Sequence, residues 1–347
     1  MHFTELNINE ALHHAIRDLG FEEATPIQAE AIPPALEGRD LIGCAPTGTG
    51  KTIAFLLPAL ETLLAANEHR KNPRLVVLAP TRELVIQISE QAKKLTAHTS
   101  LRIATEYGGA KMGQQTDRLR RGVDVVVATP GRLMDHMRRR NVDLREVKII
   151  VLDEADRMLD MGFLPDMKQI IKQTPDQRQT MLFSATMDPA VLNLAAQFQH
   201  DPVQIELNHS QPPAAIRQTL YPVPKHLKTQ LLMALLQQAE VNSTLVFTAT
   251  KQEADIVTRQ LRQAHVQVAC IHGDFNQRER IAALEGFRQG RYQVLVATNI
   301  AARGLDVEGI SHVINYDVPE HTEDYAPHWP YRSRRSRGRR HHPGNAR

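Results

Sequence analysis

Short apolar runs alternate with helix-like segments through the first 207 residues, and this alternation limits the fold more than any other feature. Each run is aliphatic or β-branched and lacks the period-two pattern of a half-exposed strand. Such runs are typical of parallel strands that helices cover on both faces, so we expect an α/β domain over residues 1–207. The clearest runs are residues 75–79, 123–128, 149–152 and 181–183.

A second alternation follows a break in the pattern at residues 208–218. Pro212 and Pro213 are adjacent there, and neither fits inside a helix or a central strand, so we expect a linker. Further strands are expected at residues 244–247, 266–271, 292–297 and 312–316. The sequence therefore predicts two tandem α/β domains, with the second over residues 219–325 and an irregular basic tail over 326–347.

The composition excludes several classes of protein. A chain of 347 residues that is 42% hydrophobic and 23% charged can bury two cores, so general disorder is excluded. The N-terminus lacks the basic and apolar regions of a signal peptide, and no run approaches 18 apolar residues. The two cysteines, Cys44 and Cys270, are isolated and form neither a disulfide framework nor a metal-binding cluster. We expect a soluble, cytoplasmic protein without a membrane partner.

The net charge of +3 says little about partners. Seven arginines lie in the last 22 residues, which contain no acidic residue, and without them 35 basic residues face 39 acidic ones. The main body is therefore slightly acidic, and any prediction of nucleic-acid binding must rest on motifs.

A phosphate-binding loop is the first chemical signal. Residues 45–52 read Ala-Pro-Thr-Gly-Thr-Gly-Lys-Thr, follow an apolar run and open a helix-like segment. They match G-x-x-x-x-G-K-[ST] except at the first position. Backbone amides of such a loop face phosphate oxygens, Lys51 would reach the β- and γ-phosphates, and Thr52 would bind Mg²⁺. The alternative is a glycine-rich turn with an incidental lysine. The loop itself comprises Ala45, Pro46, Thr47, Gly48, Thr49 and Gly50.

Two acidic residues follow the strand expected at 149–152. Asp153 would hold Mg²⁺ against the phosphates, and Glu154 would orient or deprotonate the attacking water. The alternative is that these acids cap the next helix. Together with the Lys51 loop they indicate a nucleoside triphosphatase.

Residues 153–156 spell DEAD, and an ordered series of motifs from Phe3 to about Tyr325 resembles the DEAD-box ATP-dependent RNA helicases, in particular the bacterial RhlE type. The resemblance implies two RecA-like domains, ATP and Mg²⁺ as cofactors and RNA as a partner. It implies that Gln28 recognises adenine beside Phe21 and that Ser184 and Thr186 couple hydrolysis to strand separation. It also places Gly304 and Asp306 near the nucleotide.

The family's RNA-contacting motifs have counterparts here. Their hydroxyl, guanidinium and backbone amide groups suit phosphates and 2′-hydroxyls, which carry no sequence information. The resemblance therefore implies sequence-independent RNA binding and local duplex unwinding by a monomer, with ribosome-assembly or RNA-decay complexes as candidate partners. The residues are Pro80, Thr81, Arg82, Gly108, Gly109, Thr129, Pro130, Gly131, Arg132, Gln277, Arg280 and Thr298.

The chain departs from the family pattern at two places. Pro46 stands where the family usually has glutamine, which removes one backbone N–H. After Tyr325 the family continues with His-Arg-Ile-Gly-Arg-Thr-Gly-Arg, whose arginines contact the γ-phosphate. This chain reads Ala-Pro-His-Trp-Pro-Tyr-Arg-Ser-Arg instead.

A change of reading frame explains the second departure. Residues 326–334 can be back-translated as GCA CCG CAT TGG CCG TAC CGG TCG CGC, and reading from the second base yields His-Arg-Ile-Gly-Arg-Thr-Gly-Arg. We therefore expect a frameshift after Tyr325, an incomplete second domain and a loss of RNA-stimulated hydrolysis. Two alternatives remain: a non-catalytic ATP- and RNA-binding protein, and a double-stranded DNA motor.

Overall fold

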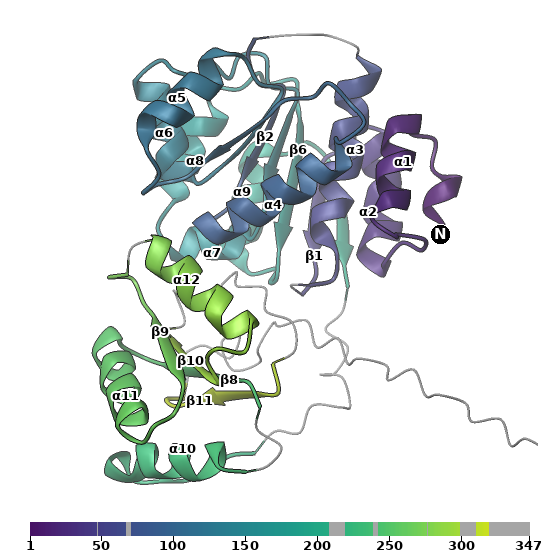
Figure 1. The fold of residues 1–347 in the computed structure, drawn as a ribbon. Helices are drawn as coiled ribbons and strands as arrows, with labels where there is room; N and C mark the ends of the chain where they lie inside the picture. Colours follow the sequence, from purple (N-terminus) through teal and green to yellow (C-terminus); the bar gives the residue numbers. More distant parts are fainter. Residues whose placement is uncertain are drawn as a thin grey trace, which may run out of the picture. The chain divides into compact units, whose positions relative to one another are not determined.

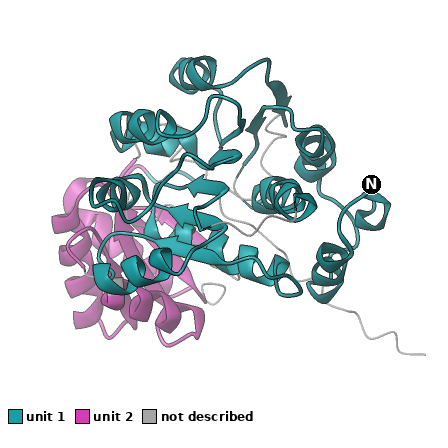
Figure 2. Ribbon diagram, turned by 90° about the horizontal axis from the view of Figure 1, so that it is seen from above, with its two compact units in different colours: residues 1–221, 303–305 teal, residues 222–302, 306–347 magenta. Residues whose placement is uncertain are grey.

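The computed structural model describes residues 1–46, 48–66, 71–207, 219–238, 242–275, 277–298 and 310–318. The chain divides into two compact units, and the boundary lies between Tyr221 and Pro222 (Figure 2). The expected linker at 208–218 and the basic tail at 326–347 lie outside the described residues, so their exact bounds stay predictions.

The described residues of the first unit form seven parallel strands in the order β3-β4-β2-β5-β6-β1-β7. Figure 1 labels β1, β2 and β6 of this sheet. The five central strands are fully buried, as expected for a sheet that helices cover on both faces. The expected α/β class is therefore confirmed. The strands are β1 (Leu41–Cys44), β2 (Leu75–Leu78), β3 (Ile103–Glu106), β4 (Val125–Ala128), β5 (Ile149–Leu152), β6 (Gln179–Ser184) and β7 (Val203–Glu206).

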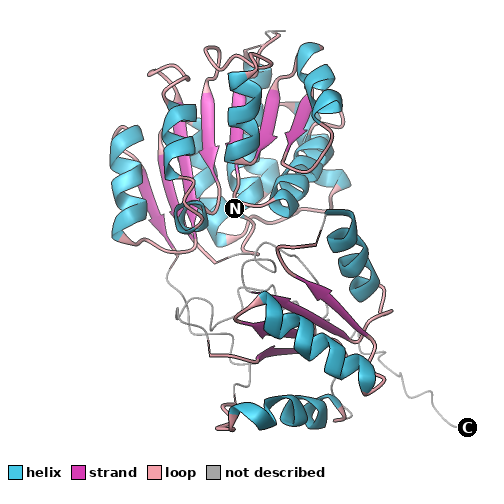
Figure 3. Cartoon of the chain, turned by 90° about the vertical axis from the view of Figure 1, so that its left-hand side faces the viewer, coloured by secondary structure: helices cyan, strands magenta, loops and turns pink. Residues whose placement is uncertain are grey.

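Two hydrophobic cores sandwich this sheet, and Figure 3 shows helices in front of the strands and behind them. Alternate strand residues point to opposite faces, so Val77 joins one core while its neighbour Val76 joins the other. The first core is covered by α1 (Glu10–Asp18), α2 (Pro26–Leu36), α3 (Lys51–Ala65) and α4 (Arg82–Leu95), with η1 (Phe3–Glu5) at its rim. The second is covered by α5 (Met112–Arg120), α6 (Pro130–Arg138), α7 (Ala155–Asp160), α8 (Leu164–Ile171) and α9 (Pro189–Phe198).

The strand order gathers the sequence motifs at one edge of this sheet. In parallel α/β sheets, ligands bind beyond the carboxyl ends of the strands. The three neighbours β5, β6 and β1 end at Asp153, Ser184 and the phosphate loop. The three neighbours β3, β4 and β2 end at residues 107–110, 129–132 and 79–82. The candidate nucleotide groups and the candidate RNA groups at these strand ends of the first unit therefore occupy adjacent halves of the same edge.

The second unit contains a parallel sheet whose described strands have the order β11-β8-β10-β9. At its edge, the Nε2 atom of His272 lies 3.1 Å from Asp255 Oδ1. In neither unit is any described helix long and apolar enough to cross a membrane. The strands are β8 (Thr244–Thr248), β9 (Val268–Ile271), β10 (Val294–Thr298) and β11 (His312–Asn315), and the helices are η2 (Lys225–Leu227), α10 (Lys228–Leu236), α11 (Lys251–Gln263) and α12 (Gln277–Arg288).

Candidate nucleotide and RNA site

The phosphate loop joins β1 to the start of α3. Gly50 is the N-cap of that helix and has a φ of 95°, a left-handed conformation that favours glycine. A Cβ atom at Gly50 would lie 3.1 Å from Thr25 Oγ1, so the position also lacks space for a side chain. Within the loop, the hydroxyl of Thr49 donates to the carbonyl oxygen of Pro46 over 2.7 Å. Thr47 lies outside the described residues, and Gly48 has a φ of 80°.

Lys51 is buried at the base of this loop. Its ammonium donates to the carbonyl oxygens of Ala45 (2.8 Å) and Ser184 (3.3 Å). Both acceptors are neutral carbonyls, which a phosphate oxygen can replace as the partner of a lysine. The side chain therefore lies where phosphates on the loop would meet it.

Asp153 and Glu154 differ sharply in their surroundings. The pKa of Asp153 is raised to about 7: burial is the main cause, the Lys51 ammonium opposes the rise, and the neighbouring Glu154 carboxylate adds to it. Glu154 has a φ of 52° and its carboxylate pairs with Arg157 over 2.8 Å. Both acids are buried, but the charged form of Asp153 would gain from a nearby cation, whereas Glu154 already has an arginine partner.

Thr52 and Asp153 fit a magnesium ion by their chemistry. Mg²⁺ takes oxygen ligands and is usually bound by one or two protein groups plus phosphates. Asp153 Oδ1 accepts a hydrogen bond from the Glu154 amide over 3.0 Å. A cation would favour its charged form, because burial otherwise disfavours that form. Thr52 is half-buried at the start of α3, one residue after Lys51.

Asp156 was missed as a site residue, although it ends the DEAD sequence. Its Oδ2 accepts a hydrogen bond from the Ala185 amide over 3.0 Å, which joins the acidic motif to the Ser184–Thr186 motif. Ser184 Oγ accepts from the Thr186 amide, and Thr186 donates its hydroxyl to Asp188. The spacing of Asp153 and Asp156, three residues apart across a helix start, was the available signal.

Gln28 connects α2 to the phosphate loop. Its Nε2 donates to the Gly50 carbonyl over 3.0 Å, and its Oε1 accepts from the Thr25 amide over 2.9 Å. Phe21 and Phe3 lie with ring centroids 6.3 Å apart, and Phe21 packs against the first core. Gln28, which is expected to recognise adenine, is therefore hydrogen-bonded to the loop expected to hold phosphate.

The candidate RNA groups of the first unit lie on three neighbouring loops. Thr81 caps α4 by accepting from the Leu84 amide, and the buried Pro80 precedes it. The guanidinium of the next residue, Arg82, lies against the glycine pair, since a Cβ atom at Gly109 would be 2.9 Å from Arg82 Cζ. The Thr129 amide donates to the Glu106 carbonyl over 3.0 Å. Pro130 and Gly131 then form the first turn of α6.

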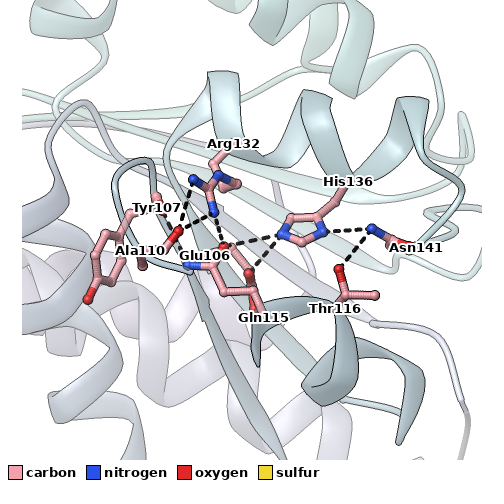
Figure 4. Close-up of polar contacts among 8 residues, drawn as sticks. All are labelled: Glu106, Tyr107, Ala110, Gln115, Thr116, Arg132, His136 and Asn141. Atoms are coloured by element: carbon pink, nitrogen blue, oxygen red, sulfur yellow. Dashed lines mark hydrogen bonds and ion pairs between the residues drawn. The ribbon is translucent and has the colours of Figure 1, made fainter. Parts of the chain in front are cut away.

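A buried polar cluster underlies two of these loops and was not predicted (Figure 4). Arg132 donates to the carbonyl oxygen of Ala110 and to Gln115 Oε1. Glu106 and His136 complete it, and both side chains are fully buried. Two signals were available in the sequence. His136 lies three residues after the buried Leu133 of α6, and Glu106 is an acidic residue at the end of a strand.

The second unit carries the remaining expected contacts. Arg280 lies on α12, and Thr298 ends β10 with 8% of its surface exposed. Gly304 and Asp306 lie outside the described residues, as does the side chain of Gln277.

Known proteins share this combination of motifs and fold. A sequence model described as DEAD/DEAH box helicase matches residues 25–194, and one described as helicase conserved C-terminal domain matches residues 227–333. The ATP-dependent RNA helicase RhlB of Pseudomonas aeruginosa is 44% identical over 331 residues, which cover 93% of this chain and 83% of that protein. The chain belongs to the DEAD-box helicase family. It is thus an ATP-hydrolysing RNA helicase by family.

Other DEAD-box relatives are longer than this chain. The helicase CshA of Listeria monocytogenes is 42% identical, and the DEAD-box ATP-dependent RNA helicase 30 of Arabidopsis thaliana is 45% identical. The match covers 93% of this chain in both cases but 62% and 56% of those two proteins.

Solved DEAD-box structures share the fold. The structure of Dbp5 from S. cerevisiae, bound to RNA and ADP BeF3, is 31% identical with a TM-score of 0.81, and the match covers 93% of this chain and 82% of that one. A DEAD box protein from Methanococcus jannaschii is 35% identical with a TM-score of 0.56, with coverage of 94% and 87%. The predicted tandem RecA-like architecture is confirmed by these matches.

Proposed function

We propose that this chain binds ATP with Mg²⁺ on its first unit and uses the nucleotide to separate short RNA duplexes. The observation that carries the proposal is a continuous set of contacts at the carboxyl edge of the sheet. Lys51 bonds to Ser184, and Asp156 bonds to the amide of Ala185. The phosphate loop, the acidic motif and the coupling motif are thus joined directly by hydrogen bonds.

Each residue has a defined task in this proposal. Lys51 exchanges its carbonyl partners for phosphate oxygens, and Gln28 holds the adenine beside Phe21. Thr52 and Asp153 would hold Mg²⁺, which neutralises the charge that develops on the phosphates. Glu154 orients and deprotonates the attacking water, which requires its carboxylate to leave Arg157. Ser184 and Thr186 pass the change at the γ-phosphate to the RNA-binding loops.

RNA binding in this proposal is independent of sequence. The groups offered by Thr81, Arg82 and Thr129, with the amides of Gly108 and Gly109, suit the sugar–phosphate backbone. Dbp5, which resembles this chain, has been solved with RNA bound, which supports the same partner here. Assignment to the RhlE type stays a prediction, because none of the relatives named above carries that name. Cytoplasmic location, a monomeric state and ribosome-assembly or RNA-decay partners are also proposals.

The turnover of this chain is a separate part of the proposal. Residues 326–334 lack the arginine motif that another reading frame would encode. An arginine that contacts the transferring phosphate contributes on the order of 10³–10⁵ in rate. We expect ATP binding to survive in this chain and RNA-stimulated hydrolysis to be nearly absent.

The test compares two proteins in an ATPase assay with RNA: this chain, and a chain in which the other frame replaces the sequence after Tyr325. The proposal predicts turnover only in the second, and Glu154→Gln in that protein removes the turnover again. Equal turnover by both proteins would show that the missing arginines are not needed. If neither protein hydrolyses ATP, the result would favour a non-catalytic ATP- and RNA-binding protein. The absence of the arginine motif is also compatible with that function. Equal stimulation by DNA and RNA would favour a DNA motor.

A further inference from the structure

Gln115 is a buried residue of α5 that bridges two of the candidate RNA loops (Figure 4). Only 3% of its surface is exposed. Its Nε2 donates to the Tyr107 carbonyl over 3.2 Å, and its Oε1 accepts from Arg132 Nη1 over 2.6 Å. The amide thus uses both ends: one holds the loop that follows β3, and the other holds the first turn of α6.

A second layer holds Gln115 in place. His136 Nε2 lies 3.3 Å from Gln115 Oε1 and 3.1 Å from Glu106 Oε2. His136 Nδ1 lies 3.2 Å from Asn141 Nδ2, which also donates to the Thr116 hydroxyl. Buried polar groups that lose their partners cost free energy, so a network with this many contacts resists rearrangement.

The guanidinium of Arg132 donates its hydrogen bonds to other protein atoms in this network. Besides Gln115, it reaches the carbonyl oxygen of Ala110 with Nη1 (3.3 Å) and Nη2 (3.4 Å). Ala110 follows the glycine pair 108–109, where Gly109 has a φ of 87°. A loop with two adjacent glycines loses much conformational entropy when it is ordered. Contacts at Tyr107 and Ala110 fix the loop on both sides of that pair.

We propose that Gln115 and Arg132 are positioning residues for RNA binding, with His136 and Glu106 as their support. They hold the amides of Gly108 and Gly109 in the arrangement that meets the RNA backbone. The charge of Arg132 is not itself a phosphate contact in this proposal. The inference rests on the proposed RNA binding of the first unit. It gives Gln115, His136 and Glu106 a role for the first time, and it replaces the expected direct RNA contact of Arg132 with a positioning role.

The first experiment measures the affinity of the full chain for a labelled single-stranded RNA in the presence of an ATP analogue and Mg²⁺. Gln115→Leu keeps the size of the side chain but removes both of its hydrogen-bonding groups, and we expect RNA affinity to fall about tenfold. Gln114→Ala changes an exposed glutamine on the same helix and should leave RNA affinity unchanged. Equal RNA affinity of Gln115→Leu and the wild type would overturn the proposal.

A second pair of variants separates positioning from charge. Arg132→Lys keeps the charge but loses the planar, two-nitrogen contact with Ala110, so positioning predicts a loss of RNA affinity close to that of Arg132→Ala. A phosphate contact instead predicts that Arg132→Lys binds nearly as well as the wild type. It also predicts that Arg132→Ala lowers the slope of log affinity against log salt by about 0.7 to 1, whereas positioning leaves the slope unchanged.

ATP affinity serves as the control for folding. None of the network residues lies in the phosphate loop, so a correctly folded variant keeps the ATP affinity of the wild type. If Gln115→Leu loses ATP binding as well, the test rests on Arg132→Lys, because that variant leaves the buried Gln115 in place. An Arg132→Lys protein that loses RNA affinity but keeps ATP affinity supports the positioning role. An Arg132→Lys protein with unchanged RNA affinity overturns the positioning role. If the wild type itself does not bind RNA, the proposed function fails, which is a different result from the failure of this inference.

Discussion

The ammonium of Lys51 lies 3.3 Å from the carbonyl oxygen of Ser184, a residue 133 positions later in the chain. This hydrogen bond crosses from the loop after β1 to the end of β6, which are neighbours in the sheet. A ligand that takes the lysine away from Ser184 therefore changes the environment of the coupling motif directly. The contact gives a physical route from bound phosphate to the residues proposed to control RNA.

The buried carboxyl of Asp153 makes the stability of the ligand-free chain depend on pH. Its pKa is raised from 3.8 to about 7, chiefly by burial. The folded state then holds a proton that the unfolded state has released between about pH 4 and 7, so the free energy of unfolding falls as the pH rises through that window. Asp153→Asn should remove this decline and raise the stability at pH 8 by roughly 2–4 kcal/mol.

Urea unfolding of both proteins at pH 5 and pH 8 measures this difference. The same variant should lose ATP hydrolysis in the frame-restored chain, because the amide cannot replace a charged metal ligand. A parallel pH dependence in wild type and Asp153→Asn would assign the titration to another group.

Gly50→Ala should weaken both folding and ATP binding. The φ of 95° costs roughly 1–2 kcal/mol for a residue with a side chain, and the new Cβ would press on Thr25 and Gln28. Gly20→Ala is a matched control, because Gly20 has a φ of 69° but no atom within 4 Å of its Cβ position. Thermal unfolding and ATP titration of both variants measure the two effects. Equal losses of ATP affinity in the two variants would contradict a special role for the space around Gly50.

Arg74 and Asp124 form a buried ion pair of 3.0 Å, with side chains 1% and 2% exposed. Arg74 also donates to the Leu63 carbonyl, and Asp124 accepts from the Arg102 amide. Arg74→Ala leaves the buried Asp124 carboxylate with only the more distant, half-exposed Arg102 guanidinium at 3.7 Å, so we expect a loss of about 3 kcal/mol in the free energy of unfolding. ATP affinity of the folded fraction should not change. A loss below 1 kcal/mol in urea unfolding would contradict this account.

The central strands were predictable from the sequence because they are buried on both faces. The runs at 75–79 and 149–152 match β2 and β5 to within a residue. The edge strands β3 and β7 were missed, since their mixed residues, such as the Glu106 that ends β3, do not form an apolar run. At the edge of a sheet one side of the strand is unpaired, so the periodic signal is weaker there.

The candidate site was predictable where a motif is continuous in the chain. The loop at Lys51 and the acids at Asp153 each occupy a few adjacent residues. The cluster around Gln115 was not predictable, because Glu106, Gln115 and His136 come from separate elements and meet only in the fold. The ion pair between Glu154 and Arg157 was also not predictable, because it depends on side-chain geometry that a sequence pattern does not contain.

The central claim, that the first unit is a nucleotide site built on Lys51, is tested most directly by titrating the full chain with a fluorescent ATP analogue in the presence of Mg²⁺. Hydrogen bonds to a charged group contribute about 1.5–3 kcal/mol, so Lys51→Ala should lower the affinity roughly 10- to 100-fold. Lys94→Ala, which changes an exposed lysine of α4 in the same unit, should bind as the wild type does. Equal affinity of the wild type and Lys51→Ala would contradict the account.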